Sequence, residues 1–216
     1  MRAMVLAETG SLDRSPAPLQ MVDVPRPVPG RGELLLEVSV CGVCHTEIDE
    51  IEGRAMPPRL PVIPGHEIIG RVFAAGPDCA RYRTGQRVGV GWIHASSGAD
   101  DENLSSRFLA TGRDVDGGYA EFVSVPERYA YPIPAVFNDA EAAPLLCAGG
   151  VGYRSLRLTG LEDGQVLGLT GFGGSGHLVL QLAKHLYPSS EVFVFARSEQ
   201  ERAFAIELGA DWAGDT

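Results

Sequence analysis

The sequence has no apolar run long enough to cross a membrane, and the apolar segment at its N-terminus is too short for a secretory signal. Basic residues are also scarce. Its 18 Lys and Arg stand against 28 Asp and Glu, which gives a net charge of -10. This deficit argues against a nucleic acid held through its phosphates. We therefore expect a cytoplasmic protein that has neither a membrane nor a nucleic acid as a partner.

Cysteine is rare as well, with four residues in a chain of 216, so a scaffold held together by disulfides is not indicated. In the expected compartment these residues would be free thiols or metal ligands. Internal repeats and low-complexity segments are absent. The 27 Gly and 15 Pro are instead spread along the chain, which indicates many turns between short elements.

Two patterns divide the chain. Up to about residue 130 the sequence predicts an all-β, barrel-like unit. It has strands at 2–8, 33–40 and 67–76, a turn followed by a strand at 85–90 and at 117–123, and a segment rich in Pro, Gly and polar residues at 11–32. After a helix cap at Asn138, it predicts parallel α/β structure with helices at 139–158, 177–186 and 198–209 and strands at 166–170 and 192–195. The predicted domains are residues 1–145 and 146–216.

A glycine-rich turn follows the predicted strand at 166–170 and opens the next helix. Its glycines are Gly171, Gly173, Gly174 and Gly176. In this context they allow a backbone to approach a pyrophosphate at a helix N-terminus, which indicates a dinucleotide site. A purely structural turn is the alternative.

The end of the next predicted strand bears on the choice of dinucleotide. An acidic residue that would hold a ribose 2′-hydroxyl is absent, and Arg197 and Ser198 stand there instead. An Arg without the acid suits a 2′-phosphate, so the sequence favours NADP over NAD. Glu199 lies close enough to support the opposite choice, and Arg197 could also be an ordinary solvated loop residue.

The residues that indicate metal chemistry are Cys44, His66 and Cys147. Two sulfurs and one imidazole nitrogen form a set that leaves a fourth position open, as in catalytic zinc sites. Glu67 follows His66 directly and could be a partner or an alternate ligand. Cys41 is more readily interpreted as structural.

The remaining histidines and cysteine carry less information. His45 follows Cys44 and could face a cofactor phosphate or simply solvent. His94, His177, His185 and Cys79 have no supporting partners in the sequence, and we expect no functional role for them. Trp92 could line a substrate pocket or belong to the barrel core.

Six segments together resemble the zinc-dependent, medium-chain alcohol dehydrogenases, in that family's order and spacing. They are GVCHTE (42–47), PGHEIIGRV (64–72), GQRVGV (85–90), GGYAEF (117–122), APLLCAGG (143–150) and GFGGSG (171–176). The resemblance covers essentially the whole chain. It implies an N-terminal GroES-like β-barrel domain followed by a partial doubly wound parallel (Rossmann) sheet.

The resemblance also implies roles for individual residues. Cys44, His66 and Cys147 would bind the catalytic zinc, and Glu67 would be the carboxylate that can visit the metal. Thr46 would take the proton of the substrate hydroxyl, and Glu47 would support the ligands from behind. The implied reaction is hydride transfer between an alcohol or aldehyde and NAD(P), with zinc as the Lewis acid. Such enzymes can be homo-oligomers.

Three departures from the family pattern stand out. The stretch 93–108, where many members hold a structural zinc with four cysteines, has none, so we expect no structural zinc. The second departure lies at two positions near the reaction site. Asp49 stands where many members have a relay His, and Val151 stands where a Thr often supports the nicotinamide.

The third departure is length, because family chains exceed about 300 residues. We expect a fragment, or a chain whose remainder another chain supplies. One alternative function is a non-catalytic zinc-binding scaffold. Another is a zinc-free quinone or enoyl reductase, which the intact set of metal ligands argues against.

Overall fold

The computed structural model describes residues 1–215 and separates into two compact units, Met1–Cys147 and Ala148–Thr216. Among the described residues, no helix combines the length and the apolar composition needed to cross a membrane.

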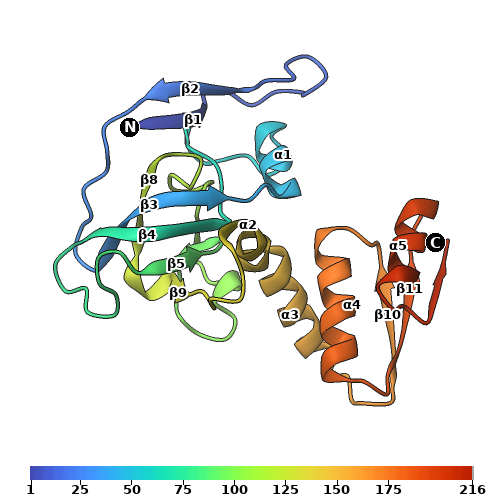
Figure 1. The fold of residues 1–216 in the computed structure, drawn as a ribbon. Coiled ribbons are helices and arrows are strands. Elements are labelled where there is room, and N and C mark those ends of the chain that lie inside the picture. The colour runs from blue at the N-terminus through green and yellow to red at the C-terminus, as the bar shows by residue number, and fades with distance from the viewer. Residues whose placement is uncertain (216) are drawn as a thin grey trace. The chain divides into compact units, whose positions relative to one another are not determined.

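The first unit consists mainly of strands (Figure 1). They are β1 (Arg2–Leu6), β2 (Leu19–Asp23), β3 (Glu33–Cys41), β4 (Ile68–Ala75), β5 (Arg87–Val90), β6 (Ile93–Ala95), β7 (Leu109–Ala110), β8 (Phe122–Pro126) and β9 (Ala130–Pro132). Five of them form a curled antiparallel sheet in the order β8-β3-β4-β5-β9, while β1 pairs with β2 and β6 with β7. The helical segments are α1 (His45–Ile51), α2 (Asp139–Ala142) and the single turns η1 (Glu102–Leu104), η2 (Glu127–Tyr129) and η3 (Ala143–Leu146).

Strand β3 lies inside this sheet and carries much of its core. Strict alternation would bury only every second side chain, yet Leu34, Leu35 and Leu36 are all buried. Leu34 and Leu36 belong to one core cluster, whereas Leu35 points to the opposite face and is buried there, so both faces of β3 are covered. Each buried leucine contributes roughly 1.5–3 kcal/mol. The strand therefore holds the start of the Cys41–Cys44 turn firmly in place.

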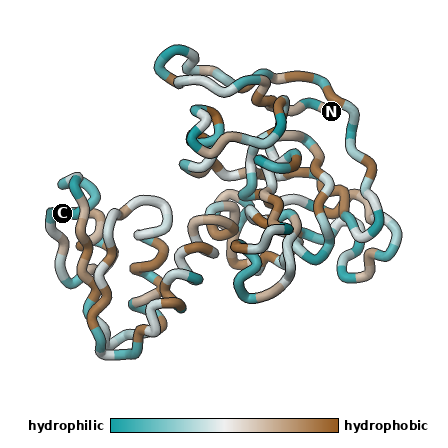
Figure 2. Tube along the Cα trace, turned by 180° about the vertical axis from the view of Figure 1, so that it is seen from behind, coloured by the Kyte–Doolittle hydropathy of each residue, from teal (hydrophilic) through white to brown (hydrophobic). Residues whose placement is uncertain are grey.

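The second unit contains α3 (Ala148–Leu158), β10 (Val166–Thr170), α4 (Gly174–Leu186), β11 (Glu191–Phe195), α5 (Glu199–Glu207) and β12 (Trp212–Gly214). The three strands form a parallel sheet in the order β10-β11-β12. Figure 2 shows hydrophobic residues along these strands and hydrophilic ones at the connecting turns. Val192 and Val194 of β11 and Leu180 of α4 are fully buried, so the helix packs on the sheet through one apolar stripe.

Several elements differ from the sequence prediction. The segment 11–32, in which no strand is predicted, contains β2, which is stabilised by pairing with β1. In the predicted turn and strand at 117–123, the strand β8 begins only at Phe122, and Gly117 and Gly118 donate hydrogen bonds to the loop at Ile63 and Gly65. Helix α4 begins at Gly174 and not at His177. The predicted cap at Asn138 is confirmed, since its side chain accepts the N–H of Glu141 at 3.0 Å.

Candidate metal centre

The candidate centre begins where β3 ends and α1 starts. Cys44 is the N-cap of α1, and Oε2 of Glu47 accepts its backbone N–H at 2.7 Å. This capping contact fixes the entry of the helix and the direction of the Cys44 side chain.

The structure brings Cys44, His66, Glu67 and Cys147 together, with one potential ligand atom from each lying within 4.8 Å of the others. His66 and Glu67 are buried in the loop before β4, and Cys147 follows η3. Room for the carboxyl of Glu67 depends on Gly42, because a Cβ there would lie 2.0 Å from its Oε2. Residues distant in sequence thus converge on one point of the first unit.

The donor set fits zinc. The sulfur atoms of Cys44 and Cys147 lie 3.8 Å apart, and both residues are free cysteines. Two Zn–S bonds of about 2.3 Å at a tetrahedral angle would place two sulfurs about 3.8 Å apart. A disulfide would require about 2.05 Å. The sulfur pair is therefore spaced as metal ligands are.

The protonation of the ligands is tightly coupled. Contact with Cys147 Sγ, with a further contribution from His66, lowers the pKa of Cys44 to about 3. The same contact raises the pKa of Cys147 well above its ordinary value. Burial lowers the pKa of His66, but contacts with Cys44 and Glu47 outweigh burial and raise that pKa to about 10. A metal ion binding here would thus release protons from His66 and Cys147.

Two buried carboxyl groups of α1 support the centre from behind. Oε1 of Glu47 lies 2.6 Å from Nδ1 of His66, which leaves Nε2 as the nitrogen for a metal. Glu50, one turn later, is also buried, and burial together with Glu47 raises its pKa to about 7. Sequence reasoning missed Glu50, although its spacing of three from Glu47 on one helix was a signal that the two share a face.

The predicted catalytic and phosphate-facing residues of α1 separate into two groups. Thr46 Oγ1 lies 3.5 Å from Cys44 Sγ and so belongs to the surroundings of the cluster. Asp49 pairs with Arg54, whose Nε lies 2.7 Å from Oδ1. His45 has a side chain that is 76% exposed and lies 3.9 Å from Asp49. Asp49 and His45 therefore stand together on the more exposed side of the helix.

In the second unit, Gly171 and Gly173 precede α4, and Gly174 and Gly176 lie in its first turn. A Cβ at Gly176 would lie 2.9 Å from the Gly171 carbonyl oxygen, so the turn needs glycine there to close. The four glycines line a cavity of about 520 Å³. The predicted turn thus presents backbone N–H groups at a helix N-terminus, as phosphate sites do.

Arg197 and Ser198 follow the end of β11, the strand next to β10. Arg197 is exposed, while Ser198 Oγ accepts the N–H of Glu201 and caps α5.

Trp92 packs its ring against Phe108 at 5.4 Å between centroids. Cys41 packs against the barrel core, and Cys79 donates to the Glu33 carbonyl at 3.2 Å.

Comparison with known proteins agrees with this geometry. Residues 30–135 match the alcohol dehydrogenase GroES-like domain. The protein AdhA of Mycobacterium tuberculosis is 41% identical over 226 residues, covering 100% of the chain and 64% of AdhA. An alcohol dehydrogenase of Geobacillus stearothermophilus is 36% identical, and the match covers 90% of the chain and 59% of that enzyme. The solved structure of CAD from Helicobacter pylori, complexed with NADP(H), is 25% identical in sequence and has a TM-score of 0.85. The match covers 98% of the chain and 63% of CAD.

The chain therefore belongs to the zinc-type, medium-chain alcohol dehydrogenase family. The predicted fold class, an α/β chain with a GroES-like β-barrel domain followed by a partial Rossmann sheet, is confirmed. The chain spans 64% and 59% of the lengths of the two curated relatives.

Proposed function

We propose that this chain is the metal-binding and nucleotide-binding portion of an oxidoreductase that interconverts alcohols and aldehydes with NAD(P). The observation that carries this proposal is the spacing of the Cys44 and Cys147 sulfurs, 3.8 Å, in one cluster with His66 and Glu67. That spacing suits a tetrahedral zinc.

Cys44, His66 and Cys147 would hold one catalytic zinc, with Glu67 as an alternate ligand. Bound zinc and nicotinamide supply a Lewis acid and a hydride acceptor or donor. Glu47 keeps the imidazole of His66 oriented through Nδ1. The segment 93–108 has no cysteine, so we propose that the chain binds no structural zinc.

Thr46 is the proposed first acceptor of the substrate hydroxyl proton, since its Oγ1 lies beside Cys44. Asp49 is proposed as the next group toward solvent. Because Asp49 is held by Arg54 and lies near His45, the proton would leave through the exposed side of α1. This exit would differ from a histidine relay.

The glycines at 171, 173, 174 and 176 would hold the pyrophosphate of the cofactor, and His45 would face a cofactor phosphate. Arg197 and Ser198 would receive a 2′-phosphate, so NADP is favoured over NAD. The solved neighbours include a protein complexed with NADP(H) and an NAD-dependent alcohol dehydrogenase, so they support a nicotinamide cofactor in general and do not favour either one. We retain residues 1–145 and 146–216 as the proposed catalytic and cofactor domains, small alcohols or aldehydes as substrates, and a homo-oligomeric state.

The zinc content of the purified chain, measured by mass spectrometry, tests the metal assignment. We expect one equivalent, which Cys44→Ser abolishes and the control Cys79→Ser retains. Absence of zinc from the folded wild-type chain would refute a metal enzyme and leave a scaffold. Two equivalents would show that a structural site exists after all. Hydride transfer, followed by nicotinamide absorbance, then separates an enzyme from a zinc-binding scaffold.

A further inference from the structure

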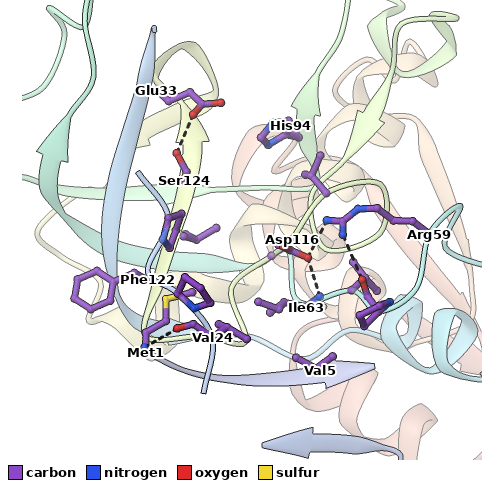
Figure 3. Close-up of a pocket in the computed structure, with 17 residues that line it drawn as sticks. Met1, Val5, Val24, Glu33, Arg59, Ile63, His94, Asp116, Phe122 and Ser124 are labelled. Atoms are coloured by element: carbon purple, nitrogen blue, oxygen red, sulfur yellow. Dashed lines mark hydrogen bonds and ion pairs between the residues drawn. The ribbon is translucent and has the colours of Figure 1, made fainter. Parts of the chain in front are cut away.

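A second cavity in the first unit has no role in the proposed function. Its volume is about 520 Å³, and none of Cys44, His66, Glu67 or Cys147 lines it (Figure 3). Its walls come from β1, the segment after β2, the loops before β4 and β8, and strands β6 and β8. A cavity of this size falls within the range of small-molecule sites, roughly 300–1,000 Å³.

The walls are mainly apolar. Valine, isoleucine, proline and phenylalanine side chains dominate, among them Val5, Val62, Ile63, Val115, Phe122 and Val123. Val62 and Val123 are buried in the unit, so this part of the wall is formed by the folded core. A ligand here would gain most of its affinity from an apolar body.

Most charged groups at the cavity are already satisfied by protein partners. Asp116 Oδ1 accepts the N–H of Ile63 at 3.1 Å and pairs with Arg59 Nη2 at 2.9 Å. Glu33 Oε2 accepts the hydroxyl of Ser124 at 3.0 Å. Figure 3 shows the two Asp116 contacts and the Glu33–Ser124 contact on different sides of the cavity. The N-terminal ammonium of Met1 also lines the cavity and donates to the Val24 carbonyl at 2.8 Å. With Arg59 and this ammonium set against two carboxylates, the lining has no net charge to attract an anion.

His94 differs from these charged groups because one of its ring nitrogens has no partner. It lines the cavity from β6, and its Nδ1 is buried with no hydrogen-bond partner in the described part of the chain. Burial lowers the pKa of His94, so the ring is neutral at physiological pH. A neutral imidazole has one nitrogen that donates and one that accepts. Because Nδ1 is buried, a molecule in the cavity would meet Nε2, and a hydroxyl group can donate to this nitrogen or accept from it.

From the apolar walls, the satisfied charges and the unsatisfied imidazole, we infer that this cavity binds a neutral small molecule with an apolar body and a single hydroxyl, anchored on His94. The site is separate from the metal centre and does not depend on the proposed reaction. The occupant is therefore a ligand and not a reactant.

The test uses p-cresol, toluene and p-toluate as probes. All three share a ring and a methyl group, and p-cresol has no carbinol hydrogen, so dehydrogenation cannot consume it. Each is titrated into the whole chain while methyl NMR signals are followed. We expect saturable shifts at Val5, Val62, Ile63 and Val115. We expect p-cresol to bind about 5-fold more tightly than toluene, as one net hydrogen bond allows. We expect p-toluate to bind most weakly.

His94→Phe keeps an aromatic ring at this position and removes both ring nitrogens. It should therefore bring the ratio of p-cresol to toluene affinity to about one. Cys44→Ser, which disables the metal site, should leave that ratio unchanged. Equal affinities in the wild-type chain would overturn the inference without any variant. Shifts confined to Ile69 and Leu146, which pack with α2, would also overturn it, and so would preferential binding of p-toluate.

Discussion

Glu47 and His66 form a buried pair in which Oε1 of the carboxylate lies 2.6 Å from Nδ1 of the imidazole. The other oxygen of the same carboxylate accepts the backbone N–H of Cys44 at 2.7 Å. One side chain thus joins the backbone of one proposed metal ligand to the ring of another. Both residues are almost fully buried, so water cannot replace either contact.

This double role predicts the effect of Glu47→Gln. The amide oxygen can accept one of the two N–H groups, and its NH2 opposes the other. We expect zinc affinity to fall about 10- to 100-fold, the usual effect of losing a partner behind a metal ligand. Competition with a chelator measures it. Glu52→Gln, which alters a carboxylate at the end of the same helix, should leave the affinity unchanged. Unaltered affinity in a folded Glu47→Gln protein would contradict this role.

The sequence allowed the ligand set to be predicted because thiolate and imidazole side chains rarely occur in such a pattern without a metal. Cys44 and Cys147 nevertheless lie more than a hundred positions apart, and only the fold shows that their sulfurs approach to 3.8 Å. Two of the three strands of the parallel sheet were predictable too, since short apolar runs such as 192–195 are typical of such strands, whereas β12 was not predicted. Family resemblance added the proposed roles of Thr46 and Glu67.

Other features could not be found in the sequence because long-range contacts determine them. Strand β2 has little pattern of its own and depends on β1 for its hydrogen bonds. Glu50 and His94 look like ordinary polar residues until the fold buries the side chain of Glu50 and the Nδ1 atom of His94. Their chemistry arises from desolvation, which a sequence does not display.

Glu50 makes stability depend on pH in a defined direction. Its pKa rises from 4.5 to about 7, first through burial and then through Glu47, with His66 and Arg113 opposing and Asp114 adding to the rise. Stability from the protonated form is fully present below pH 4.5 and is lost as pH rises through about 7. Glu50→Gln should therefore gain stability relative to wild type, by at most about 3 kcal/mol, between about pH 5 and pH 8.

Denaturant unfolding of both proteins at equal metal content measures this difference. The comparison at the acidic end is the internal control, because a carboxylic acid and an amide are then similar in charge. A constant difference across the whole range would show that the pKa of Glu50 is the same in the folded and unfolded chain.

The loop at 93–108 is held by hydrogen bonds in place of cysteine ligands. Oε2 of Glu102 accepts the hydroxyl of Tyr129 at 2.8 Å and the N–H of Gly98 at 3.1 Å. Glu102→Ala should speed amide exchange at Gly98 and lower the free energy of unfolding by about 1–3 kcal/mol. Asp101→Ala removes an adjacent exposed acid and should do neither. Treatment with a chelator should leave exchange in this loop unchanged, and faster exchange would reveal a structural metal.

Arg197 is the residue on which the choice of cofactor depends. Arg197 is exposed shortly after the end of β11, and its guanidinium is the cationic group nearest in sequence to that strand end. The hydroxyl of the neighbouring Ser198 caps α5. Arg197→Ala should weaken NADP binding about 10-fold or more, as loss of a charged hydrogen bond does, and leave NAD binding unchanged. Fluorescence titration with each cofactor gives both constants, and Arg157→Ala, at the exposed end of α3, is the control. If Glu199→Ala instead weakens NAD while Arg197→Ala affects neither cofactor, the acidic residue holds the ribose and NAD is the cofactor.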